Sequence, residues 1–262
     1  MTLRFCCLGS GSGGNAFVVE ASDGRSSIRV LIDDGFSPRE LQRRLARAGV
    51  DLVSLGAILV THEHGDHAGG VAAFATRRQL SVYATGGTAT AAGFDRRLRR
   101  LHTIRAGIEL QIGPLQVLPI GVPHDASEPV QFMVSDGERR LAILTDLGHP
   151  AQTVITRVSS LDTLVLEFNH DLDMLRQGPY PPSLKARIES DVGHLSNAQS
   201  IQFLESIDRS RLTRVVAAHL SLTNNRPQLA RAALGGLGMP VHVQCDVADQ
   251  ALGLDWQAVG PP

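Results

Sequence analysis

The sequence predicts an α/β protein of four layers, an αββα sandwich in which two β-sheets pack face to face and helices cover their outer surfaces. Short runs rich in Val, Ile and Leu recur in both halves of the chain, segments with helical spacing lie between them, and turn residues separate the runs. With 262 residues, a hydrophobic content of 43% and no linker, the chain is expected to bury one large core. Residues 1–262 are therefore predicted to form a single domain.

The chain opens with short strands, predicted at residues 3–8, 16–20 and 28–32. The glycine-rich segment between the first two matches the G-x-G-x-x-G pattern of dinucleotide-binding proteins. That pattern requires a helix after the glycines, whereas residues 16–20 are apolar and β-branched. A dinucleotide site is therefore not expected. The small residues still let backbone N–H groups approach an anion, and Ser10 in this segment is a candidate substrate contact.

The first predicted helix covers residues 37–48, with Ser37 as its N-cap, Glu40 three residues later and Gly49 as its end. A strand at residues 57–60 and a short helix from Val71 follow. Two strand-rich halves flanked by helices are what an αββα sandwich requires. The remaining strands are predicted at residues 80–84, 115–122, 131–134, 140–144, 163–168 and 214–218, and the remaining helices at residues 197–207 and 227–234.

A dense group of potential metal ligands directly follows the strand at residues 57–60. His62, His64 and His67 lie within six residues together with Asp66. A lone histidine usually has a structural role, but imidazole and carboxylate are the usual nitrogen and oxygen ligands of zinc, and four of them on one short loop favour a metal site. His62 and His64 can point the same way on an extended segment, while Asp66 and His67 can turn toward a second ion. The spacing therefore favours two metals.

The motif HEHGDH at residues 62–67 resembles the signature of the metallo-β-lactamase superfamily. The segments LGSGSGGN, LEFNHDLDMLRQGPYPPSLKARIESDVGHLSN and AAHLSLTNN are similar to the bacterial YycJ/WalJ group of that superfamily, whose members are regarded as DNA exonucleases. The resemblance extends over residues 3–243. It implies the four-layer αββα fold and a metal-dependent phosphodiesterase that degrades DNA, in the 5′-to-3′ direction.

Further potential ligands follow other predicted strands, because His124, Asp146 and His219 each lie just beyond a strand end. The resemblance implies two divalent ions per chain, zinc or manganese, with Asp146 as the bridge between them. Ions about 3.5–4 Å apart lower the pKa of a shared water and stabilise both oxygens of a phosphodiester displacement. By the same resemblance, one ion has the ligands His62, His64 and His124, and the other has Asp66, His67 and His219.

His194 is the candidate for a catalytic group outside the ligand set, and the resemblance also gives Asp66 a catalytic role. His194 precedes a predicted helix whose N-cap is Ser196, and helix N-termini attract phosphate. By resemblance to transfer-RNA 3′-processing nucleases, His194 binds phosphate or donates a proton; a structural capping role is the alternative. The remaining candidate substrate contacts are Asn169 and His170, which follow a predicted strand, and Lys185, the single lysine of the chain.

The formal net charge of -1 means that any contact with nucleic acid must come from a local basic patch. One arginine group falls on the helix at residues 37–48 and is interpreted as a solvated face. A second group is a candidate contact with a phosphate backbone, and comprises Arg96, Arg97, Arg99, Arg100 and Arg105.

DNA is the expected partner and substrate, and a small cyclic phosphodiester or a thioester is the alternative, because one metal site serves many reactions on this fold. A metal-binding module without catalysis is a third reading. No run approaches the ~20 apolar residues of a membrane span and no signal peptide is recognised, so a cytoplasmic protein without membrane contact is expected. Cys6, Cys7 and Cys245 are expected to be free thiols, the adjacent pair buried. The sequence does not indicate an oligomeric state.

Overall fold

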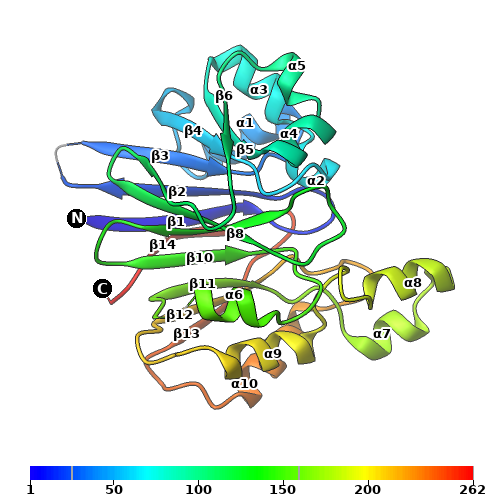
Figure 1. Ribbon diagram of the computed structural model, residues 1–262. Helices are drawn as coiled ribbons and strands as arrows, with labels where there is room; N and C mark the ends of the chain where they lie inside the picture. Colours follow the sequence, from blue (N-terminus) through cyan, green and yellow to red (C-terminus); the bar gives the residue numbers. More distant parts are fainter. Residues whose placement is uncertain (25, 159, 262) are drawn as a thin grey trace.

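The computed structural model describes residues 1–24, 26–158 and 160–261, which form two seven-stranded β-sheets packed face to face with helices on both outer faces (Figure 1). This arrangement confirms the predicted four-layer sandwich. The apolar layer between the sheets includes Phe5, Phe17 and Phe132, all fully buried. Burial of apolar area on this scale is the main favourable term in the stability of such a fold.

The first sheet contains both ends of the chain, because β14 (Leu254–Ala258) pairs antiparallel with β1 (Thr2–Gly9). Parallel pairing begins between the third and fourth strands along the chain. The sheet continues from β1 through β2 (Ala16–Ser22), β3 (Ser27–Ile32), β4 (Leu55–Leu59), β5 (Ser81–Thr85) and β6 (Leu101–Ile104). Its outer face is covered by α1 (Pro38–Arg47), α3 (Val71–Arg78), α4 (Gly86–Ala91) and α5 (Phe94–Arg97).

The second sheet has parallel strands at one side and an antiparallel hairpin at the other. It runs in the order β13 (Gln244–Val247), β12 (Arg214–Ala218), β11 (Thr163–Glu167), β10 (Arg140–Leu144), β9 (Val130–Ser135), β8 (Leu115–Gly121) and β7 (Leu110–Ile112). Its outer face is covered by α6 (Gln152–Arg157), α9 (Asn197–Ser206) and α10 (Pro227–Gly236). None of the helices in the described part of the chain combines the length and hydrophobicity needed to cross a bilayer.

Two of the predicted helix starts, those of α1 and α9, are confirmed by their capping contacts. The Ser37 hydroxyl accepts a hydrogen bond from the Glu40 backbone N–H at 3.3 Å, and Ser196 forms a capping box with Gln199 at the start of α9. The short elements escaped prediction, among them β6, β7 and α2 (Gly65–Ala68). With three or four residues each, they are too short to display a helical or strand period.

Cys6 and Cys7 are buried free thiols, as predicted, and point to opposite faces of β1. Burial raises the pKa of Cys6 to about 12 and raises that of Cys7 further, so neither supplies a thiolate at neutral pH. We expect Cys6→Ala and Cys7→Ala to leave the metal content of the purified protein unchanged, as measured by elemental analysis. Loss of metal from a variant that still unfolds cooperatively would contradict this expectation.

Candidate metal centre

The seven predicted metal ligands lie together at the edge of the sandwich where parallel strands of both sheets end. His62, His64, Asp66 and His67 lie on the loop that follows β4 and in α2. His124 lies between β8 and β9, Asp146 after β10, and His219 after β12. The carboxyl ends of parallel strands are the usual location of sites in α/β proteins, and strands of two sheets bring these ligands together from distant parts of the chain.

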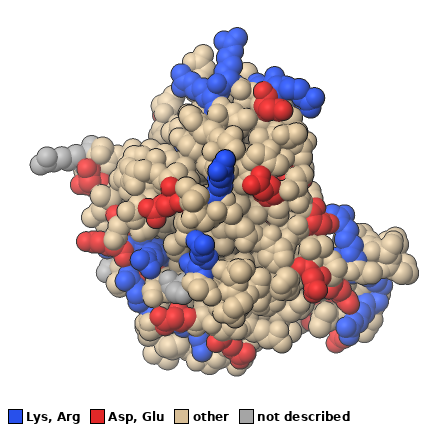
Figure 2. Space-filling model, viewed as in Figure 1, with Lys and Arg blue, Asp and Glu red and all other residues tan. Residues whose placement is uncertain are grey.

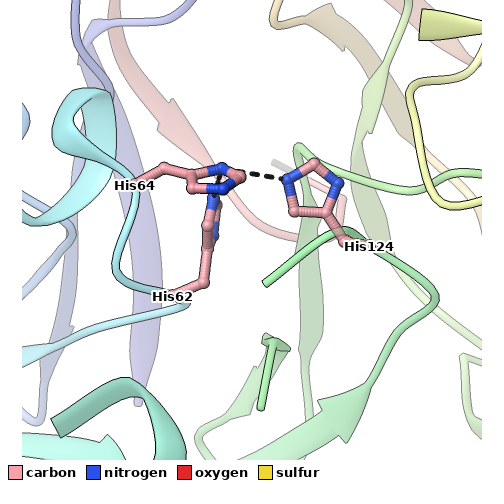
Figure 3. Close-up of side chains that lie close together, drawn as sticks. All are labelled: His62, His64 and His124. Atoms are coloured by element: carbon pink, nitrogen blue, oxygen red, sulfur yellow. Dashed lines mark hydrogen bonds between the residues drawn. The ribbon is translucent and has the colours of Figure 1, made fainter. Parts of the chain in front are cut away.

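Three imidazoles form the first donor cluster (Figure 3). His64 Nδ1 lies 3.1 Å from His62 Nε2 and 3.3 Å from His124 Nε2. A tetrahedral zinc ion with bonds of about 2.0–2.1 Å to nitrogen separates its ligand atoms by about 3.3–3.4 Å. Both distances from His64 are therefore close to the separation of ligands on one ion, and the ligand atoms of all three residues lie within 4.8 Å of one another.

The second donor cluster contains Asp66, His67 and His219. Asp66 Oδ2 lies 3.7 Å from Nε2 of His67 and 3.7 Å from Nε2 of His219. Asp146 lies between the clusters, with Oδ1 3.7 Å from His124 Nε2 and Oδ2 2.9 Å from His67 Nε2. Asp146 is 2% exposed, and imidazole nitrogens of both clusters surround its carboxylate. A buried carboxylate between two groups of imidazoles is a donor set that divalent cations favour, so the residues present suit two ions.

Hydrogen bonds at the far side of the ring orient three of the histidines. His67 Nδ1 lies 2.8 Å from Asp33 Oδ2, His124 Nδ1 lies 3.1 Å from the Gly193 carbonyl, and His219 Nδ1 donates to the Thr145 carbonyl. In each case the acceptor holds a proton on Nδ1, so Nε2 is the nitrogen that can bind a metal, and a metal at that position replaces any proton there. Asp33 directly follows the predicted strand at residues 28–32, and this position at a strand end is the one sequence signal for its role.

The pKa values of the residues in the two clusters follow from burial and from the few carboxylates nearby. Burial lowers the pKa of His62 and His124, which leaves neutral rings with free lone pairs. Burial has the same tendency at His67, but the Asp146 and Asp33 carboxylates outweigh it and raise the pKa of His67 to about 10. Burial raises the pKa of Asp146, yet the neighbouring His219 and His67 hold it well below its usual range. The carboxylate is therefore ionised and available to a cation.

We expect Asp33→Ala to weaken metal binding selectively. Asp33 also accepts hydrogen bonds from the Thr61 N–H and hydroxyl, both at 2.8 Å, so its loss frees the His67 ring to rotate. Losing such an orienting partner typically lowers metal affinity by about 10- to 100-fold. Titration with a chelator should remove one ion more easily than in the wild type and the other ion as in the wild type. Asp255→Ala, at an exposed carboxylate, is the control, and equal retention of both ions in the two variants would contradict the assignment.

A pocket of about 370 Å³ opens over the two clusters. Asp66, Asp125 and Asn169 line it near the ligands, and Tyr180 and Arg187 form a further wall. That wall belongs to an arm formed by α7 (Leu172–Gln177) and α8 (Pro182–Ile188), which projects from the body of the protein (Figure 1). Arg187 forms an ion pair with Asp125, which ties the arm to the loop that carries His124.

His194 lies at the pocket with its ring centroid 5.3 Å from that of His124 and 5.4 Å from that of His219. Its side chain is 25% exposed, and its Nδ1 lies 2.7 Å from Oε1 of Glu167. The other Glu167 oxygen accepts from the backbone N–H groups of Leu147 and Leu195 at 2.9 and 3.0 Å. Glu167 was not singled out in the sequence, although it is the one acidic residue of the predicted strand at residues 163–168.

The four predicted substrate contacts are placed differently from one another. Asn169 lines the pocket, and its amide donates to the His219 carbonyl at 3.1 Å. Ser10 is buried and accepts from the His219 N–H at 3.0 Å, and His170 is fully buried. The Lys185 ammonium donates to the Arg176 carbonyl at 2.7 Å, which holds it at the end of α7. The cation on the pocket wall is instead Arg187, and the hydroxyl on the glycine-rich loop is that of Ser12.

Residues 28–219 match the family model of the β-lactamase superfamily domain. The chain belongs to the metallo-β-lactamase superfamily. It is 34% identical over 239 residues to exodeoxyribonuclease YycJ of Bacillus anthracis, which covers 89% of this chain and 88% of that protein. It is 31% identical over 259 residues to exodeoxyribonuclease WalJ of Streptococcus pneumoniae, with 97% and 92% covered. The fold matches the metallo-β-lactamase fold protein YhfI of Bacillus subtilis with a TM-score of 0.74, at 14% identity over 98% of this chain and 100% of that one.

The superfamily and these relatives make the protein a metal-dependent hydrolase. They also support a nuclease activity and the use of divalent metal ions. The resemblance noted in the sequence motifs is thereby confirmed.

Proposed function

We propose that this protein is a DNA exonuclease that hydrolyses phosphodiester bonds with two divalent ions and proceeds in the 5′-to-3′ direction. The observation that carries the proposal is the His194–Glu167 pair, which lies in an open pocket directly beside two donor clusters bridged by Asp146. The two relatives named as exodeoxyribonucleases support DNA as the substrate. His62, His64 and His124 would hold one ion, Asp66, His67 and His219 the other, and Asp146 both.

When bound, two zinc or manganese ions supply Lewis-acid stabilisation of the reacting phosphate and lower the pKa of an attacking water. Asp66 lines the pocket with a carboxylate that can accept the proton of that water. His194 faces the same space. With a proton on Nδ1 held by Glu167, a protonated His194 presents Nε2–H to the leaving oxygen or to the scissile phosphate. Burial lowers the pKa of His194, but Glu167 and Asp146 outweigh this effect and raise it, which favours the protonated ring.

The arm supplies groups that suit a nucleotide. Arg187 can pair with a phosphate at the cost of its contact with Asp125, and Tyr180 offers an aromatic face on which a base can stack. Stacking is tolerant of sequence, because every base has a π-face. We therefore propose that the arm holds the terminal nucleotides without selecting their identity.

The test is incubation of the purified protein with DNA labelled at either end, with zinc or manganese added. A 5′-to-3′ exonuclease releases the 5′ label early as a mononucleotide, leaves the 3′ label on progressively shorter strands, and spares circular single-stranded DNA. Early release of the 3′ label would overturn the proposed direction. Cleavage of the circle would overturn the exonuclease assignment.

The alternative function is hydrolysis of a small cyclic phosphodiester or a thioester. The pocket volume of about 370 Å³ favours it, because small-ligand sites typically fall at about 300–1,000 Å³. This alternative would be established if the protein hydrolyses such a substrate and leaves DNA intact with every metal tested. A protein that binds two ions and hydrolyses none of these substrates would instead be a binding module.

A further inference from the structure

We infer that the protein has a second DNA-binding surface, separate from the metal pocket, which grips the phosphate backbone of a strand whose end lies in that pocket. This inference rests on the proposed function, because that function identifies the bound strand as DNA. The surface, called here the arginine surface, lies at the end of α3, on α5 and on the segment leading to β6. It consists of Arg77, Arg78, Arg96, Arg97, Arg99 and Arg100.

The first observation is the uneven charge of the chain. Residues 71–108 contain seven arginines and one carboxylate, Asp95, a formal charge of +6 in a chain whose net charge is -1. Figure 2 shows basic side chains gathered at the top of the view, over α3 and α5. Such a local concentration attracts polyanions even when the whole protein is nearly neutral.

The second observation is that, within the part of the chain that the structure describes, five of these six arginines form no ion pair with a carboxylate. Some exposed arginines elsewhere form ion pairs, as Arg43 does with Glu40 and Arg211 with Asp162, whereas others such as Arg39 and Arg231 form none with any described residue. On the arginine surface, the ion pairs found within the described residues are limited to Arg96 with Asp95 at 3.8 Å. Arg77 and Arg78 lie in the last turn of α3, where the helix dipole favours basic residues. Arg99 and Arg100 lie outside any helix, so the dipole does not account for their positions.

The third observation is a pocket of about 390 Å³ on this surface. Its walls include Arg97, Arg99 and Arg100, and apolar side chains such as Leu80 and Leu98 also line it. Arg100 is held in place because its Nη1 donates to the Gln79 carbonyl at 2.9 Å, at the end of α3. A concave site lined by three arginines suits phosphate oxygens, which guanidinium groups bind through charge-assisted hydrogen bonds.

The position of the arginine surface suits a strand that also reaches the metal centre. The α3 helix begins at Val71, just after the metal loop, and its eight residues span about 12 Å. The two pockets have no lining residue in common. A strand several nucleotides long can therefore occupy both sites, since phosphates along one strand of duplex DNA are about 3.4 Å apart.

The test compares two triple variants of the holoenzyme. Arg97→Ala/Arg99→Ala/Arg100→Ala removes the pocket cations, and Arg39→Ala/Arg157→Ala/Arg231→Ala removes the same charge at exposed positions elsewhere. The probes are labelled oligodeoxythymidylates of 30 and 4 nucleotides with phosphorothioate linkages, which keep the charge and resist hydrolysis. Fluorescence anisotropy gives Kd at several salt concentrations, and thermal unfolding checks the fold of each variant.

We expect the pocket variant to bind the 30-mer about 10- to 100-fold more weakly than the control, with a slope of log Kd against log salt smaller by about 2. Binding of the 4-mer should change equally little in both variants. Equal affinities and slopes for the 30-mer in the two variants would overturn the inference. If the wild type binds the 30-mer through this surface but cleaves no DNA, the proposed function fails and the binding surface stands.

Discussion

Replacing Asp146 with alanine is expected to remove both metal ions and to abolish hydrolysis. One Asp146 oxygen faces His124 in the first cluster and the other faces His67 in the second, so a single substitution removes a ligand from each ion. Loss of an orienting partner alone costs about 10- to 100-fold in metal affinity, so loss of the shared ligand should exceed about 100-fold. Elemental analysis after dialysis, together with the rate of DNA degradation, measures the effect.

The matched comparison is His124→Ala, which removes a ligand from the first cluster alone. This variant should retain the ion held by Asp66, His67 and His219 and lose mainly the other. Thermal unfolding checks that Asp146→Ala remains folded, because its removal leaves buried imidazoles without their carboxylate. An Asp146→Ala protein that keeps two ions per chain would show that the bridge is assigned to the wrong residue.

Replacing His194 with alanine is expected to lower the rate by about 10²- to 10⁴-fold while both metals remain bound. His194 lies outside the two three-ligand clusters assigned to the ions, although it is also within ligand distance of Asp146, Glu167 and His219. With both metals still bound, the loss would come from a missing proton donor or phosphate contact. Elemental analysis is the control for metal content, and His102→Ala, at an exposed histidine on β6, is the control for substitution of a histidine. If His194→Ala hydrolyses DNA at the wild-type rate, His194 has no catalytic role and is only a residue that flanks α9.

The two roles of His194 can be separated with a nitrophenyl phosphodiester, whose leaving group needs no proton. A proton donor becomes dispensable with that substrate, whereas a phosphate contact does not. The turnover number of the wild type should also fall as pH rises through the pKa of His194, and this basic limb should be missing in His194→Ala.

Glu167→Gln is expected to move the basic limb to lower pH. The Glu167 carboxylate counteracts the lowering effect of burial on the pKa of His194, so an uncharged amide in its place lets that pKa fall. The protonated ring is then lost at a lower pH. A pH profile of the turnover number identical to that of the wild type would show that Glu167 has only a structural role in holding Leu147 and Leu195.

The sequence was sufficient to predict the helices and strands whose capping residues or apolar periodicity lie within the element itself. Ser37, Glu40 and Gly49 define the helix that became α1, and alternating apolar runs define most strands of both sheets. The metal loop could also be predicted from the sequence, because His62, His64, Asp66 and His67 are residue types that bind metals and lie within six residues of one another. The superfamily motif then predicted which distant residues join them.

The sequence by itself determined the four-layer fold, the class of chemistry and the ligand types, because these depend on local periodicity, capping and residue chemistry. The tertiary structure alone decided which side chains face the pocket. Glu167 and His194 are paired across 27 residues, and Asp33 reaches His67 across 34, contacts that no local pattern encodes. Packing likewise turned Ser10 and His170 inward and placed Arg187, rather than Lys185, on the pocket wall. The direction of a side chain at a strand end or on a projecting arm depends on what packs against it, and that partner lies far away in the sequence.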